Sequence, residues 1–81
     1  MYFVYILESE KDPTKIYVGF TNDLNKRLEE HNASQSTYSK RYAPWTLVSY
    51  TAFKHKTTAQ EFETYLKSGS GFAFLKKRFL K

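Results

Sequence analysis

The first segment of the chain is apolar at every position. Residues 2–7 are β-branched, aromatic or leucine side chains without a charged interruption, which is typical of a strand that is buried on both faces. An Asp12-Pro13 pair then signals a turn, and residues 15–20 carry Ile, Val and Phe at every second position, which predicts a second strand. We expect the two strands to pair in antiparallel order, with the first at the centre of a sheet.

The next segment has the spacing of a helix. Four of its residues lie at i, i+3, i+4 and i+7 and would share one face: Leu24, Arg27, Leu28 and His31. Asn22 is the expected cap of a helix that opens at Asp23, and Asn32 is the expected left-handed stop. An Arg and a His interleaved with two leucines that face the sheet are out of place in a purely structural helix. We therefore expect the Arg and the His to lie at the rim of a cleft.

The pattern changes again after this helix. Residues 33–44 are polar and basic, which predicts a loop with a short helical turn. Residues 45–53 are rich in β-branched and aromatic side chains and predict a third strand. Its buried candidates are Leu47, Val48 and Tyr50.

Two more helices are expected after the third strand. Thr58 and Glu61 have the spacing of a capping box at the start of the first of these helices. The helix would carry one apolar stripe, made of Ala59, Phe62 and Leu66. The Ser-Gly-Ser-Gly run at residues 68–71 is expected to end it.

The last helix would place three apolar residues on one face, with basic residues around them. These three are Phe72, Leu75 and Phe79. The resulting element order is β-β-α-β-α-α. It predicts an α+β fold in which a small three-stranded antiparallel β-sheet is flanked by helices.

Length and composition restrict what the chain can be. With 81 residues, we expect residues 1–81 to form one small domain. Seven Phe, seven Tyr and one Trp supply large rings that fill a small core efficiently, and the absence of Cys excludes disulfides and thiolate metal sites. The apolar N-terminus is too short for a signal peptide, and no stretch approaches the length of a membrane span. The sequence therefore predicts a cytoplasmic protein without a membrane partner.

The positive charge is concentrated in the second half of the chain. Residues 1–31 carry four Lys and Arg against six Asp and Glu, whereas residues 32–81 carry nine against two, a net charge of +7. Such a bias favours a polyanionic partner, most often nucleic acid.

Several enzyme classes are excluded by missing motifs. The sequence has no glycine-rich phosphate loop, no H-E-x-x-H, no EF-hand loop and no Asp-x-Asp pair that would hold two metal ions. Only two histidines are present, which argues against a histidine-rich zinc site.

Two short motifs lie on the first two predicted strands, FVY at residues 3–5 and YVG at residues 17–19. A helix pattern follows them, with Thr21 ahead of it and Arg27 and His31 on one face, and a later helical segment at 59–67 contains Glu63. In this order and spacing, the whole chain resembles the GIY-YIG nuclease superfamily. It looks closest to the small stand-alone bacterial members of the UPF0213 type.

The resemblance implies roles in phosphodiester hydrolysis. Tyr17 would act on the attacking water as a base or an orienting group, and Tyr5 would support the site from the first strand. Arg27 would clamp the scissile phosphate, since its planar fork suits bidentate contacts. His31 would orient the water or share its proton. Glu63, with Glu61 as the rival carboxylate, would be the single protein ligand of one Mg²⁺ or Mn²⁺ ion.

The basic second half supplies the candidates for nucleic-acid contact. These are Lys40, Arg41, Lys76, Lys77 and Arg78. Our leading hypothesis is a divalent-metal-dependent endonuclease or nickase that acts on DNA, in repair or recombination. The last helix lacks the Asn that many catalytic relatives carry near the site, so a non-catalytic nucleic-acid-binding module is the alternative. A protein-interaction domain with incidental charge is the third hypothesis, and the sequence leaves open whether the chain forms dimers.

Overall fold

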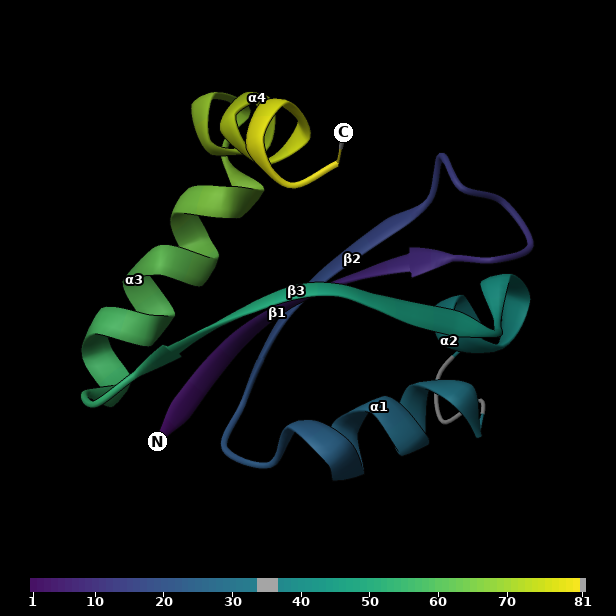
Figure 1. Cartoon of the computed structure of the whole chain (residues 1–81), viewed down its shortest axis with the longest axis horizontal. Coiled ribbons are helices and arrows are strands. Elements are labelled where there is room, and N and C mark those ends of the chain that lie inside the picture. The colour runs from purple at the N-terminus through teal and green to yellow at the C-terminus, as the bar shows by residue number, and fades with distance from the viewer. Residues whose placement is uncertain (34–36, 81) are drawn as a thin grey trace.

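A three-stranded sheet forms the middle layer of the molecule (Figure 1). The computed structural model describes residues 1–33 and 37–80, with only the backbone described for residues 37–39. The strands are β1 (Tyr2–Ser9), β2 (Ile16–Thr21) and β3 (Trp45–Phe53), in the order β2-β1-β3. Both neighbours run antiparallel to β1. The predicted sheet, its central strand and its strand order are confirmed.

The two faces of β1 bury different sets of side chains. Val4 and Ile6 belong to one core, whereas Tyr5 and Leu7 belong to another, and all four are at most 3% exposed. This separation follows from the two-residue period of a strand, which sends successive side chains to opposite faces. A strand covered on both faces needs the unbroken apolar run that the sequence shows.

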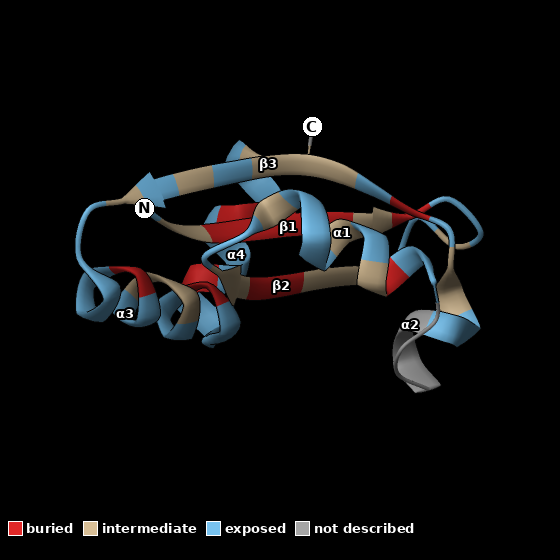
Figure 2. Cartoon of the chain, turned by 90° about the horizontal axis from the view of Figure 1, so that it is seen from below, coloured by how far each residue is buried: buried red, intermediate tan, exposed pale blue. Residues whose placement is uncertain are grey.

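Helices cover both faces of the sheet (Figures 1 and 2). On one face lies α1 (Leu24–Asn32), whose Leu24 and Leu28 pack against the core that contains Tyr5. On the other face lie α3 (Lys56–Lys67) and α4 (Gly69–Arg78), which bury their apolar residues against Val4 and Ile6. A short helix, α2 (Thr37–Tyr42), precedes β3. Among the described residues, no helix is both long and apolar enough to cross a membrane.

The helix ends differ from the predictions. Asp23, not Asn22, caps α1, because its carboxylate accepts a hydrogen bond from the Lys26 amide. Asn32 is the last helical residue and no left-handed stop, since the cap residue is Ala33 with φ of −84°. The short helical turn predicted within the loop at residues 33–44 is present as α2, at positions 37–42, and positions 34–36 lie outside the described residues.

The start of α3 also corrects the sequence analysis. This helix begins at Lys56 with His55 as its cap residue, so Thr58 and Glu61 do not form the predicted capping box. The stripe of α3 is confirmed, with Ala59 and Leu66 fully buried. Ser68 ends α3 and also caps α4, accepting a hydrogen bond from the Gly71 amide, so the run at residues 69–71 opens the last helix.

Two aromatic residues predicted to be buried are exposed. Tyr50 is 52% exposed and Phe72 is 41% exposed. In α4 the buried residues are Gly71 and Leu75, four positions apart, so the buried face is turned away from Phe72. A Cβ atom on Gly71 would overlap with the Tyr65 carbonyl, which shows that glycine permits the close crossing of α4 over the end of α3.

Candidate active site

The site is organised around Tyr5, in the middle of the central strand. Its side chain is only 1% exposed, and its register partner on β2 is Gly19. A Cβ atom at Gly19 would overlap with the Tyr5 hydroxyl and ring. Glycine is therefore needed here to make room for the phenol. It does so within a regular strand pairing.

His31 and Tyr17 enclose the Tyr5 phenol. The Tyr5 Oη lies 3.1 Å from His31 Nε2, which brings the end of α1 onto the central strand. The Tyr17 ring stacks near the Tyr5 ring at 6.2 Å and meets the His31 ring edge-on at 4.4 Å. His31 is 7% exposed, so it lies inside the site, and the prediction that it sits at the rim of a cleft is wrong.

The protonation states of Tyr5 and His31 follow from the shifts in their pKa values. Burial, together with the neighbouring Tyr17, raises the pKa of Tyr5 to about 12, although Arg27 opposes this rise. Burial also lowers the pKa of His31, and the positive charge of Arg27 lowers it further. At neutral pH, Tyr5 is thus a protonated phenol beside a neutral imidazole, and in the His31 tautomer whose proton is on Nδ1 the phenol donates to Nε2.

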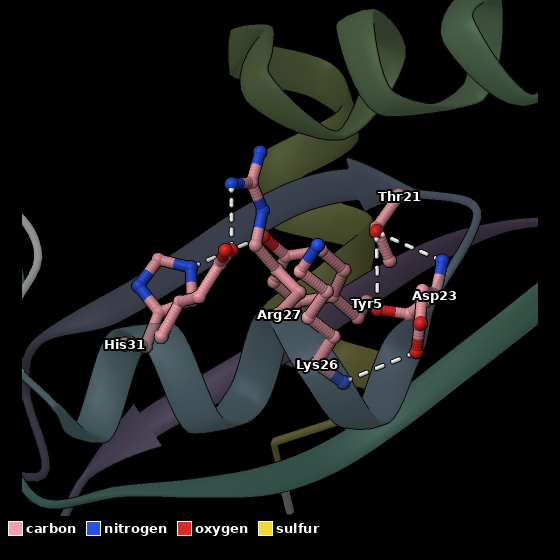
Figure 3. A network of polar contacts seen from close by, with 7 residues as sticks. Tyr5, Thr21, Asp23, Lys26, Arg27 and His31 are labelled. Atoms are coloured by element: carbon pink, nitrogen blue, oxygen red, sulfur yellow. Dashed lines mark hydrogen bonds and ion pairs between the residues drawn. The ribbon is translucent and has the colours of Figure 1, made fainter.

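Arg27 is the accessible cation of this cluster (Figure 3). Partial burial acts against its charge, but interactions with Tyr5 and with Glu30 outweigh it and raise the pKa of Arg27. Its Nη1 lies 3.3 Å from Glu30 Oε1, and its side chain is 46% exposed. An exposed i,i+3 pair of this kind is weak. The guanidinium is therefore free to turn towards an anionic ligand while it stays close to the Tyr5 hydroxyl.

Glu63 approaches the cluster from α3, on the other face of the sheet. Its charge also raises the pKa of Tyr5, as the weakest of the influences on that phenol. The side chain is 22% exposed, and its Oε2 lies 2.8 Å from the Lys67 ammonium. The rival carboxylate, Glu61, is exposed on the same helix. The geometry thus favours Glu63 over Glu61 as the carboxylate of the site.

The donor set restricts the kind of metal ion that would fit. Within residues 1–33 and 37–80, no group of three or more His, Cys, Asp or Glu side chains is placed to hold a metal. Mg²⁺ binds through one or two carboxylates and keeps several waters, and it often takes its remaining ligands from phosphates. A half-buried carboxylate such as Glu63 suits an ion of this type, completed by water and substrate.

Asn32 is a contributor that the sequence analysis missed. Its Oδ1 accepts a hydrogen bond from the Trp45 amide at 2.6 Å, and its Nδ2 donates to the Trp45 carbonyl at 3.3 Å. The Trp45 ring in turn lies 6.4 Å from the His31 ring and 6.3 Å from the Tyr17 ring. Asn32 thereby ties the end of α1 to the start of β3 and fixes the position of its neighbour His31. The available sequence signal was a polar residue adjacent to His31.

The five basic residues predicted to contact nucleic acid lie outside this cluster. Lys40 and Arg41 belong to α2, at one end of the molecule, and Lys76, Lys77 and Arg78 form the end of α4 (Figure 1). All five are exposed. Beside Arg27 there is also an open pocket of about 380 Å³ between the start of α1 and the start of α3. Its cationic lining residues are Lys26, Arg27 and Lys56.

The comparisons with known proteins agree with this geometry. A family model described as the GIY-YIG catalytic domain matches residues 1–77. The chain belongs to the GIY-YIG family. It is 37% identical over 68 residues to a UPF0213 protein of Clostridium perfringens, covering 83% of this chain and 71% of that protein. The solution NMR structure of a UPF0213 protein from Bacillus halodurans has the same fold, with a TM-score of 0.56 and 30% identity over 95% of this chain and 84% of that one.

Larger proteins of the family share the domain. The structure-specific endonuclease subunit SLX1 homolog of Giardia intestinalis is 34% identical over 65 residues, which cover 75% of this chain. The match spans only 18% of that endonuclease subunit. A similar subunit of Talaromyces stipitatus is 37% identical over 68 residues, again over 18% of its length. The chain therefore corresponds to one part of these proteins and to most of a UPF0213 protein.

Proposed function

We propose that this chain is a divalent-metal-dependent endonuclease or nickase that hydrolyses phosphodiester bonds in DNA. The observation that carries the proposal is a set of five side chains from four elements that lie around the Tyr5 hydroxyl on the central strand or act electrostatically on it. They are Tyr5, Tyr17, Arg27, His31 and Glu63. Membership in a family described by its catalytic domain supports the same reaction class. The relatives named as structure-specific endonuclease subunits favour a branched or otherwise unusual DNA substrate, in repair or recombination.

Each group has a part in the proposed reaction. Arg27 binds the scissile phosphate and stabilises the charge that develops on its oxygens. Glu63 holds one Mg²⁺ or Mn²⁺, which would polarise the phosphate and support the departing oxygen. Tyr17, which is less buried than Tyr5, orients the attacking water.

The cluster also offers a route for the proton that the water loses. As the water oxygen bonds to phosphorus and the ester P–O bond breaks, the Tyr5 Oη accepts the proton. Tyr5 passes its own proton to the neutral His31 Nε2, 3.1 Å away. This relay avoids a free phenolate, which the raised Tyr5 pKa makes unfavourable. The leaving oxygen takes a proton from solvent.

The test is nicking of supercoiled plasmid and of a labelled branched DNA, with Mg²⁺ or Mn²⁺ against chelator. We expect Glu63→Ala and Arg27→Ala to reduce the rate by about 10²-fold or more. The matched controls are Glu61→Ala and Lys26→Ala, which remove exposed charges of the same sign from the same helices and should keep most of the activity. Equal traces of product from wild type and Glu63→Ala would indicate a contaminant and refute the proposal.

A non-catalytic nucleic-acid-binding module is the second candidate. It is favoured by α4, whose residues 69–78 offer aromatic, basic and small side chains but no Asn beside the site. This candidate predicts binding that weakens steeply with salt, together with no metal-dependent product.

A further inference from the structure

Phe72 is a large aromatic residue in the first turn of α4, and it is exposed. Its ring is 41% exposed although it lies on the first turn of α4, next to the buried Gly71. Phe72 lines two shallow hollows between β2 and α4, of about 360 and 390 Å³, and both hollows also include Ile16. These hollows are adjoining parts of one groove, because they share these two side chains.

One end of this groove reaches the candidate active site. The first hollow is also lined by Tyr17 and by Lys67, the lysine that pairs with Glu63. The second hollow contains Lys76, whose ammonium lies 5.6 Å above the Phe72 ring. An accessible aromatic side chain thus lies between two lysines, and Tyr17 is among the residues that line the hollow on the Lys67 side.

The charges around the groove indicate its occupant. Residues 69–78 of α4 contain three basic and no acidic side chains. A neutral apolar peptide would gain nothing from these cations, whereas a nucleotide presents both a flat base and an anionic phosphate. Single-stranded nucleic acid is bound in this way elsewhere, by aromatic platforms flanked by cations.

We propose that the groove is a binding site for one unpaired nucleotide next to the cleaved bond. Phe72 stacks on its base, and Lys76 leaves the ring to contact its phosphate. The proposal rests on the proposed function, since it makes the groove the continuation of the site into which the DNA strand runs. It adds a preference for unpaired over fully paired strands, because a paired base cannot leave its stack to reach Phe72 without the cost of unpairing.

The test measures binding in chelator, so that no cleavage is needed. Fluorescent oligonucleotides of one sequence are compared as a single strand, as a duplex with an unpaired flap and as a blunt duplex. We expect Phe72→Ala to weaken binding of the first two by about 5- to 150-fold, the range of one lost base–aromatic stack, and to leave the blunt duplex nearly unchanged. Phe72→Trp should bind as wild type, whereas Phe72→Leu should behave like Phe72→Ala.

Phe74→Ala is the matched control. Phe74 lies on the same helix and is 38% exposed, but its ring packs against Tyr65 and Phe79. An equal loss of affinity in Phe74→Ala, or wild-type affinity in Phe72→Leu, would overturn the stacking proposal. Self-association that Phe72→Ala abolishes would overturn it in favour of an interface between copies.

The outcomes separate this proposal from the proposed function. Metal-dependent cleavage with no effect of Phe72→Ala on binding would overturn the groove alone. Binding that depends on Phe72, together with no cleavage by wild type, would refute the nuclease and leave the groove supported. A wild-type protein that binds none of the three DNA substrates would overturn both.

Discussion

Replacing Gly19 by Ala tests the close packing on which the candidate site depends. The added methyl group would occupy the space of the Tyr5 ring and hydroxyl. The residue pairs before and after Tyr5–Gly19 are in register, so the pairing of β1 with β2 holds the two residues opposite each other. Overpacking of this kind costs about 1–3 kcal/mol, and displacing the buried phenol from His31 adds the cost of a lost buried hydrogen bond, about 1–3 kcal/mol. We expect a total destabilisation of about 2–6 kcal/mol.

Thermal unfolding followed by circular dichroism measures this effect. For a domain of this size, the expected loss corresponds to a fall in Tm of at least about 10 °C. Gly69→Ala is the control, since a Cβ atom there meets nothing within 4 Å, and its Tm should stay the same or rise. The double variant Gly19→Ala/Tyr5→Leu should regain part of the stability, because leucine lacks the atoms that overlap. If the destabilisation of the double variant equals the sum of those of Gly19→Ala and Tyr5→Leu, the packing argument is refuted.

Three further predictions concern the polar groups of the site. Tyr5→Phe removes the hydroxyl that contacts His31 Nε2. The folded-state pKa of Tyr5 lies above its unfolded value of 10.0, so the wild type should lose stability as the pH rises from 10 to 12. Chemical denaturation across this range should show no such loss for the variant. Folding lowers the pKa of His31, so its contribution to stability should be complete above pH 6.5 and should decline as the pH falls below that value. NMR titration of the imidazole should match this pH dependence of the free energy of unfolding, and His31→Gln should abolish it. Asn32→Ala should lower the free energy of unfolding by about 1–3 kcal/mol, because it removes both hydrogen bonds between the Asn32 side chain and the Trp45 backbone. It should also shift the His31 ring resonances, and an unchanged His31 spectrum would contradict the positioning role of Asn32.

The sheet was predictable because its signals are local. The unbroken apolar run of β1 indicates a strand buried on both faces, which belongs at the centre of the sheet. The alternation of β2 indicates a strand with one buried face. The stripe of α3 was predictable for the same reason, as Ala59 and Leu66 leave only one side of the helix apolar enough to bury.

The helix ends, and the face that α4 turns towards the core, depend on contacts between distant residues that the sequence does not reveal. The cap of α1 could be Asn22 or Asp23 on residue type alone, and the path of the chain after Thr21 decides between them. In α4, the stripes through Phe72 and through Gly71 are both compatible with a helix that buries Leu75. The structure selects Gly71 because only a residue without a side chain fits against the Tyr65 carbonyl.

The site shows the same division between local and distant signals. The spacing of Arg27 and His31 on α1 was visible in the sequence, because residues four apart share a helix face. The burial of His31 was not, because it depends on Tyr17 and Trp45, which come from two other elements. The Asn32–Trp45 contact joins residues 13 apart in the sequence, and no periodic pattern relates residues at that separation.

The different burial of the two site tyrosines separates their chemical roles. Both belong to the motifs that mark the family, and residue type alone makes them interchangeable. Tyr5 is 1% exposed and has its hydroxyl directed at His31, so it acts through the cluster and not on bulk water. Tyr17 lies on the edge strand and lines the groove with Phe72, where a bound strand would pass. In the proposed reaction, the edge position of β2 lets Tyr17 orient the water, and the central position of β1 places Tyr5 to pass the proton on to His31.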